Sequence, residues 1–323
     1  MEDRYGREID YLRISVTDKC NLRCRYCMPK DIDAVPMFEI LTFEEIREVV
    51  SAAAYLGIKK IKVTGGEPLV RRNICGLVDM LKSVEGIEQV TLTTNGILLS
   101  EYIDGLGKAG IDGINISLDT LDREKYKEIT GFDEFDRVKE GISTVIDRGI
   151  PLKLNAVSLN RDDVFSLIEY VRDRAIDVRF IELMPIGAGR DHGGITHDIL
   201  IPEVFEHYKG MARDESKHGN GPAVYYRIPG YKGSVGFISA LHESFCDKCN
   251  RIRLTTMGFL KNCLCYDTGA DLKKVLRSGL TEEERRQKLI LDIKEAILCK
   301  PESHCFVTKE DISEKHPMSQ IGG

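Results

Sequence analysis

The stretch Asp10-Tyr-Leu-Arg-Ile-Ser-Val-Thr-Asp-Lys-Cys20-Asn-Leu-Arg-Cys24-Arg-Tyr-Cys27 joins a β-rich run to three closely spaced cysteines. Leu12–Val16 predicts a first strand, so the C-x3-C-x2-C group lies in the loop after it. From there to residue 185, short β-rich runs alternate with amphipathic stretches and give six βα units. Right-handed crossovers make such a sheet parallel, with helices outside and ligands at the carboxyl ends of the strands.

The predicted fold class is therefore α/β, an incomplete (β/α)6 TIM-like barrel, because six units are too few to close an eight-stranded barrel. A doubly wound open sheet is the competing architecture. The predicted strands are Leu12–Val16, Lys60–Val63, Val90–Thr94, Gly113–Leu118, Leu152–Ser158 and Val178–Leu183. The predicted helices run from the capping box of Thr42 and Glu45 to Gly57, over 73–83, up to Ala109, and over 134–148 and 162–175.

The pattern changes after Pro185. Here the sequence predicts a loop at 186–198, a short helix Ile201–Tyr208, strands Tyr225–Ile228 and Ser234–Ser239, and helices over 271–277 and 281–298. We expect two functional parts: residues 1–235 as the barrel core and 236–323 as a C-terminal region.

Charge and composition restrict the partners of the chain. Its 323 residues carry 46 basic and 52 acidic side chains, a net charge of −6, which disfavours nucleic acid as a partner. The first ten residues are charged, and no run approaches the roughly 18 apolar residues of a membrane span. We therefore expect a cytoplasmic protein without a membrane partner.

Ten cysteines are many for a cytoplasmic chain, where clustered thiols indicate metal or redox chemistry. The first group is Cys20, Cys24 and Cys27. Zinc usually takes four ligands, and the first histidine of the chain is His192. A [4Fe–4S] cluster can use three thiolates and leave one iron open, so the spacing favours iron–sulfur chemistry over zinc.

The second group is Cys246, Cys249 and Cys263. Its spacing fits zinc as well as iron, since His242 and Cys265 lie nearby. Arg251 and Arg253 alternate along a predicted strand beside this group, which puts both guanidinium groups on one face. Paired arginines of this kind can hold a polyphosphate. A P-loop motif is absent from the sequence, so any nucleotide is not held in the manner of a P-loop GTPase.

The first cysteine group resembles the signature of radical S-adenosylmethionine (SAM) enzymes. Gly65-Gly66-Glu67-Pro68 follows the second strand and resembles the segment that holds the SAM amino group in that superfamily. Both cysteine groups, the two arginines and the final Gly322-Gly323 together resemble GTP 3′,8-cyclase, the family of molybdenum cofactor biosynthesis protein A. The resemblance extends from Asp10 to the last residue.

This resemblance implies two [4Fe–4S] clusters, one on each cysteine group. The first makes a 5′-deoxyadenosyl radical from SAM, which takes the C3′ hydrogen of GTP. Bonding of C3′ to C8 then gives (8S)-3′,8-cyclo-7,8-dihydroguanosine 5′-triphosphate, in the first step of molybdenum cofactor biosynthesis. It also implies a low-potential electron donor, cyclic pyranopterin monophosphate synthase as the downstream partner, and a monomer or homodimer.

The same resemblance assigns individual residues. Those matching SAM-binding positions are Tyr26, Gly66, Ser117 and Met184. Those matching GTP-binding positions are Arg13, Lys62, Thr93, Lys153, Arg251 and Arg253, with Lys60 and Arg179 as further triphosphate contacts. Arg251, Arg253, Gly322 and Gly323 are the expected catalytic residues. Two alternatives stay open: a radical SAM peptide maturase with an auxiliary cluster, and a non-enzymatic two-cluster electron carrier.

Overall fold

A computed structural model describes residues 1–28, 35–216, 218–242, 245–306, 312–314 and 316–322. Twelve strands form one sheet: β1 (Tyr11–Ser15), β2 (Lys60–Thr64), β3 (Gln89–Thr94), β4 (Gly113–Ser117), β5 (Leu152–Val157), β6 (Asp177–Ile181), β7 (Ala212–Arg213), β8 (Val224–Arg227), β9 (Val235–Ile238), β10 (Arg251–Leu254), β11 (Phe259–Lys261) and β12 (Gly269–Asp271). Their spatial order is β12-β11-β10-β1-β2-β3-β4-β5-β6-β9-β8-β7. The stretch from β10 to β9 is parallel throughout, and the outer strands add to it antiparallel.

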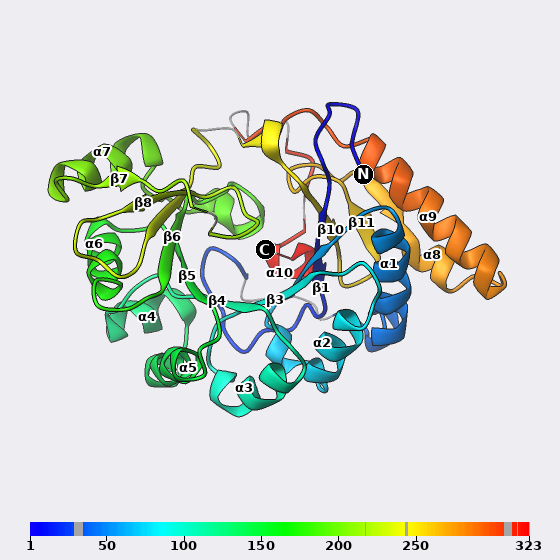
Figure 1. Cartoon of the computed structure of the whole chain (residues 1–323), viewed down its shortest axis with the longest axis horizontal. Coiled ribbons are helices and arrows are strands. Elements are labelled where there is room, and N and C mark those ends of the chain that lie inside the picture. The colour runs from blue at the N-terminus through cyan, green and yellow to red at the C-terminus, as the bar shows by residue number, and fades with distance from the viewer. Residues whose placement is uncertain (29–34, 217, 243–244, 307–311, 315, 323) are drawn as a thin grey trace.

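Helices cover the convex side of this curved sheet, as Figure 1 shows. They are α1 (Phe43–Tyr55), α2 (Ile74–Lys82), α3 (Leu99–Lys108), α4 (Arg123–Thr130), α5 (Phe135–Asp147), α6 (Arg161–Tyr170), α7 (His197–His207), α8 (Leu272–Leu276) and α9 (Glu282–Leu298). The last helix, α10 (Met318–Ile321), lies within the concavity instead. Short 3-10 turns are η1 (Met37–Glu39), η2 (Pro68–Val70), η3 (Gly187–Asp191) and η4 (Cys246–Lys248). In the described residues, no helix has both the length and the apolar character that crossing a bilayer requires.

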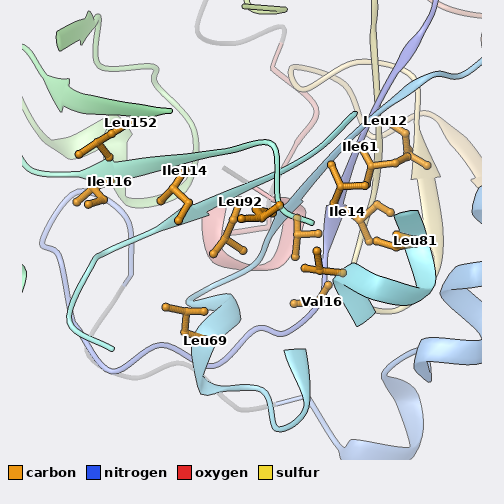
Figure 2. Packing of buried hydrophobic residues seen from close by; sticks show 14 of the residues in the cluster. Leu12, Ile14, Val16, Ile61, Leu69, Leu81, Leu92, Ile114, Ile116 and Leu152 are labelled. Atoms are coloured by element: carbon orange, nitrogen blue, oxygen red, sulfur yellow. The ribbon is translucent and has the colours of Figure 1, made fainter. Parts of the chain in front are cut away.

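Alternation along the strands divides the core from the concave side. Leu12, Ile61, Leu92 and Ile114 are almost completely buried and pack toward the helices, as Figure 2 shows. The residues between them on the same strands point to the concave side, where they line a cavity. The convex face of the sheet thus forms the hydrophobic core with the helices. The concave face of the same sheet is available for polar chemistry.

The register of the parallel strands brings distant charges together. Arg13 on β1 pairs with Lys62 on β2 on one side and with Arg253 on β10 on the other. On the neighbouring strands, Asn155 of β5 pairs with Arg179 of β6. The sheet therefore places cations from the beginning and the end of the chain in one row.

The six predicted strands and the α/β partial barrel are confirmed. One helix begins earlier than expected: α7 starts at His197, whereas the sequence predicted a start at Ile201. Its first turn is anchored by the carboxylate of Glu182, which accepts a hydrogen bond from the backbone N–H of His197 at 2.7 Å. That acceptor comes from the end of β6, so local sequence could not reveal it. Helix α4 was also not predicted.

Candidate active site

A cavity of about 840 Å³ occupies the concave side of the sheet. It is lined by almost every residue that the sequence marked: Arg13, Cys20, Cys24, Tyr26, Cys27, Lys60, Lys62, Gly66, Thr93, Ser117, Lys153, Arg179, Met184, Cys246, Cys249, Arg251, Arg253 and Cys263. The first cysteine group follows β1, Gly66 follows β2, and Met184 follows β6. The carboxyl ends of the strands therefore supply the chemistry, as a parallel barrel predicts.

The cysteine loop packs directly on the glycine pair. Gly66 N–H donates to the carbonyl of Thr17 at 2.6 Å, and Glu67 N–H donates to the carbonyl of Lys19 at 2.8 Å. A Cβ at Gly66 would lie 2.4 Å from the Lys19 carbonyl oxygen, and one at Gly65 would lie 2.6 Å from that of Thr17. Both positions thus require glycine because backbone occupies the space of a side chain.

Glu67 holds the ends of two strands together, a role that the sequence did not reveal. Its buried carboxylate accepts hydrogen bonds from Thr94 Oγ1 at 2.7 Å and Asn95 N–H at 2.6 Å. The Asn95 side chain in turn donates to Asn21 Oδ1 at 2.7 Å, inside the cysteine loop. Burial raises the pKa of Glu67 to about 7. This network fixes the loop that carries the first thiols.

Tyr26 is also held in place. Its hydroxyl donates to Asp119 Oδ2 at 2.6 Å, while Asp119 Oδ1 accepts from Val157 N–H at 2.8 Å. Burial raises the pKa of Asp119 to about 6. Ser117, two residues earlier, is exposed on the cavity wall. These contacts set one polar edge of the cavity beside the cysteine loop.

The spacing of the thiols tests the kind of metal group they fit. Tetrahedral zinc with Zn–S bonds of about 2.3 Å would bring its sulfurs to roughly 3.8 Å from one another. Among the described residues, neither cysteine trio brings its sulfurs within 4.8 Å of one another, whereas two carboxylate–histidine groups do. Both trios lie beside the cavity. In each trio at least one pair of sulfurs thus lies farther apart than the ligands of a single zinc ion, which fits the larger iron–sulfur cube better.

In the second group, Cys246 and Cys249 lie at η4, before β10, and Cys263 follows β11. Cys246 Sγ accepts a hydrogen bond from His304 N–H at 3.3 Å, and Arg251 Nη2 lies 3.9 Å from Cys249 Sγ. Burial alone would raise the pKa of Cys249, but the positive charges of Arg251 and Lys300 outweigh it and lower this pKa to about 6. Cys249 is thus prepared to act as a thiolate ligand.

His242 and Cys265 left zinc as an alternative metal for the second group, but in the structure both contact other residues. His242 Nδ1 lies 2.8 Å from Glu182, and its other nitrogen lies 3.7 Å from Asp198. Cys265 lies against Cys305. Cys263, and not Cys265, lines the cavity.

The cavity floor carries a row of buried positive charges. Arg13, Lys62 and Arg253 are adjacent through the strand register. Burial lowers the pKa of Arg13 to about 10 and holds the pKa of Lys62 and Arg253 well below their usual values, and neighbouring cations add to each effect. Mutual repulsion of this kind is relieved when an anion enters.

Three further predicted cations bond to neighbouring side chains. Lys153 Nζ lies 2.5 Å from Asp177, Lys60 forms an ion pair with Asp10, and Arg179 donates to Asn155 at 2.8 Å. The predicted Thr93 lies within 3.5 Å of the Asn115 amide. These groups line the cavity with part of their charge compensated.

The C-terminal residues reach the same place. Gly322 is buried with φ of 75°, and its carbonyl accepts a hydrogen bond from Arg253 Nη1. A Cβ there would lie 3.3 Å from Thr64 Cγ2 and 3.5 Å from Ser15 Cβ. In Figure 1, α10 lies within the concavity, where it contacts β1. Gly323 lies outside the described residues.

Sequence reasoning missed the loop at 218–222, which lines the end of the cavity away from the first cysteine group. His218, Gly219 and Asn220 line the cavity near the start of β3, and the Asn220 amide donates to Gln89. The His218 ring stacks on Tyr225 with centroids 4.1 Å apart. The polar composition of 210–222 indicated only a loop, because nothing local shows that it folds back under the barrel.

Two protein-family descriptions match the chain. "Radical SAM superfamily" matches residues 14–173, and "Molybdenum Cofactor Synthesis C" matches residues 176–306. The chain is 44% identical over 327 residues to the GTP 3′,8-cyclase of Clostridium perfringens (strain 13 / Type A), covering 100% of both. It is 45% identical to the GTP 3′,8-cyclase of Peptoclostridium acidaminophilum, covering 99% of this chain and 98% of that one.

Solved structures resemble the fold. Streptococcus suis SuiB bound to S-adenosylmethionine matches with a TM-score of 0.63 at 16% identity, covering 96% of this chain and 76% of that one. Hexahistidine-tagged anSMEcpe with bound AdoMet matches with a TM-score of 0.51 at 16% identity, covering 61% of this chain and 57% of that one. At such identities the likeness concerns the fold alone.

Proposed function

Because this chain belongs to the GTP 3′,8-cyclase family of radical SAM enzymes, we propose that its cavity binds SAM and GTP together and performs that cyclisation. The 5′-deoxyadenosyl radical made from SAM takes the C3′ hydrogen of GTP. The ribose carbon then bonds to C8 and gives (8S)-3′,8-cyclo-7,8-dihydroguanosine 5′-triphosphate. This is a lyase reaction and the first step of molybdenum cofactor biosynthesis.

One observation carries the assignment of both substrates to a single cavity. The first cysteine trio and the buried row of Arg13, Lys62 and Arg253 line the same 840 Å³ space. Buried cations crowded into one row favour a polyphosphate, since each charge-assisted contact contributes about 1.5–3 kcal/mol. The phosphates of GTP then serve as the handle that holds the reacting ribose.

At the cysteine end, Cys20, Cys24 and Cys27 would hold a [4Fe–4S] cluster. Once bound and reduced, that cluster supplies the electron that cleaves SAM. The chain positions SAM with Gly66 below the cysteine loop and with Tyr26, Ser117 and Met184 around it. Tyr26 is kept in place by Asp119.

At the other end, Cys246, Cys249 and Cys263 would hold a second [4Fe–4S] cluster near the guanine base. Arg251 and Arg253, beside this trio, would contact the triphosphate. The assigned GTP-binding residues are Arg13, Lys62, Thr93, Lys153, Arg251 and Arg253, with Lys60 and Arg179 as outer contacts. Gly322 and Gly323 are the proposed catalytic tail, and the described Gly322 bonds to Arg253.

The proposal also covers the roles of the two parts of the chain, its partners and its location. Residues 1–235 act as the radical-forming core and residues 236–323 as the GTP-directing region, although one sheet runs through both. A low-potential electron donor feeds the first cluster, and cyclic pyranopterin monophosphate synthase consumes the product. We expect the enzyme to work in the cytoplasm as a monomer or homodimer.

The test is anaerobic reconstitution of the full chain with iron and sulfide, followed by dithionite, SAM and GTP deuterated at C3′. We expect about eight irons per chain, deuterium in 5′-deoxyadenosine, and a cyclised triphosphate by mass spectrometry. 5′-Deoxyadenosine without deuterium would exclude C3′ as the site of abstraction.

Cysteine variants separate the two clusters. Replacing Cys20, Cys24 and Cys27 by Ala should remove about half of the iron and abolish SAM cleavage. Replacing Cys246, Cys249 and Cys263 should leave some SAM cleavage but no cyclised product. Cys299→Ala, at an exposed thiol, is the matched control and should change neither. Stoichiometric zinc in both groups with full activity would contradict the scheme.

A further inference from the structure

Two thiols that the reaction does not use lie against each other. Cys265 follows β11 and is completely buried, and Cys305 is half-buried in the segment after α9. Their sulfur atoms are 2.6 Å apart, and Cys305 N–H also donates to Cys265 Sγ at 3.3 Å. We propose that Cys265 and Cys305 are a modification site, at which a reversible intrachain disulfide forms.

This pair lies outside the main cavity, although the proposed metal ligand Cys263 packs against the same apolar cluster. Among the described residues, neither sulfur lines the main cavity, although Cys263 does. The pair belongs instead to a small apolar cluster with Ile186, Phe306 and Ile321. An apolar setting excludes water and holds the two thiols in one arrangement.

The disulfide would tie the C-terminal segment to the sheet. Next to Cys305, His304 N–H donates to Cys246 Sγ at 3.3 Å. Further along, Arg190 Nη2 donates to the carbonyls of Ile312 at 3.2 Å and Glu314 at 3.3 Å. The segment that the bond fixes is therefore the one that carries Gly322 to Arg253.

The chemistry balances with a small-molecule disulfide such as oxidised glutathione as the oxidant. The Cys305 thiolate attacks one glutathione sulfur and releases one reduced glutathione. Cys265 then loses its proton and attacks Cys305 Sγ, which releases the second. Two protein thiols are oxidised, one glutathione disulfide is reduced, and no further electron acceptor is needed.

The experiment uses the cluster-loaded full chain, equilibrated anaerobically in glutathione buffers of increasing oxidised fraction, then alkylated and digested. We expect a peptide pair joined through Cys265 and Cys305, formed at an oxidised fraction at least about tenfold lower than that which half-modifies exposed Cys299. Iron content should stay constant. Cys265→Ser and Cys305→Ser should each abolish the joined pair, and Cys299→Ser should leave it unchanged.

Two results would overturn the proposal: a mixed glutathione disulfide at Cys305 without the joined pair, or a pairing of either residue with Cys263. Hydrogen exchange at the Gln320 amide, which bonds to the Pro317 carbonyl, reports the tethering. Exchange there should be several-fold slower in the oxidised than in the reduced chain. Equal exchange in a fully joined sample would contradict the tether. Neither readout depends on GTP turnover.

Discussion

Lys62 is a buried ammonium group in the middle of the cavity floor. Within the described residues, no carboxylate lies at ion-pair distance from it. Burial lowers its pKa well below the usual value, and neighbouring cations, Arg179 foremost, lower it further. In the free enzyme Lys62 therefore loses its proton more easily than an ordinary lysine, and a bound polyphosphate reverses this.

Binding of GTP should consequently take up a proton when the pH lies above the lowered pKa of Lys62. The sign follows from linkage: the complex holds more protons than the free enzyme, so affinity falls as pH rises. At pH values between the lowered pKa of Lys62 in the free enzyme and its higher pKa in the complex, we expect a loss of affinity of up to about tenfold per pH unit. Titration calorimetry in two buffers of different ionisation enthalpy measures the uptake. Lys62→Arg keeps its proton and should remove the dependence; an unchanged slope would contradict the assignment.

Arg251 and Arg253 allow a test of phosphate binding against cluster binding. Replacing both by Ala removes two charge-assisted contacts, each of about 1.5–3 kcal/mol, so GTP affinity should fall by a factor of about a hundred or more. Iron content should stay near normal, because neither side chain is a metal ligand. Equilibrium dialysis with GTP and an iron assay give both values. Loss of iron with unchanged GTP binding would show that these residues support the fold.

For single residues, the sequence indicated which cations to expect in the cavity but not which of them lie side by side. Arg13 and Lys62 could be placed on adjacent strands, because consecutive βα units pair in a parallel sheet. Arg253 could not, since β10 joins β1 across most of the chain length. Strand alternation fixes the face of a residue, whereas long-range pairing fixes its partners.

Among the elements, the turn after β2 has no room for a side chain. Gly66 meets the Lys19 carbonyl so closely that no side chain fits. Gly107, in the last turn of α3, has nothing within 4 Å of a built Cβ. The two glycines thus differ in the room that they leave for a side chain, so Gly107 can serve as the matched control for Gly66.

We expect Gly66→Ala to push the cysteine loop away from β2. It should lower the melting temperature and remove about half of the iron, since only the first trio moves. Gly107→Ala should leave iron unchanged and stabilise the chain by up to about 1 kcal/mol, the helix preference of Ala over Gly. Thermal unfolding and iron assays on both variants provide the check. Full iron and normal melting in Gly66→Ala would refute the packing argument.

Element boundaries were predictable where the signals are local. The capping box of Thr42 and Glu45 opens α1 as expected. The start of α7 was not predictable, because the Glu182 carboxylate that anchors His197 belongs to a different βα unit. The role of Glu67 was not predictable for the same reason: its partners lie on β3 and beyond it.

For the molecule as a whole, the C-terminal tail gives the clearest test of the proposed site. Gly322 follows α10 and reaches the row of buried positive charges, where its carbonyl accepts a hydrogen bond from Arg253. Deleting Gly322 and Gly323, or adding a C-terminal tag, should abolish cyclisation, while iron content, GTP binding and some SAM cleavage survive. The same tag at Met1 is the control. Product analysis by mass spectrometry decides: normal turnover without the two glycines would make the tail an ordinary frayed end.

The pairing of β1 has a consequence for how the chain folds. One side of β1 finds β2 after a single βα unit, but the other side waits for β10. Until then it presents unpaired backbone groups, which makes it a template for association with other chains. High contact order slows this last step, and the like charges of Arg13 and Arg253 oppose it. We therefore expect slow refolding that inorganic tripolyphosphate accelerates, so the substrate's own phosphates would assist the chain in reaching its native state.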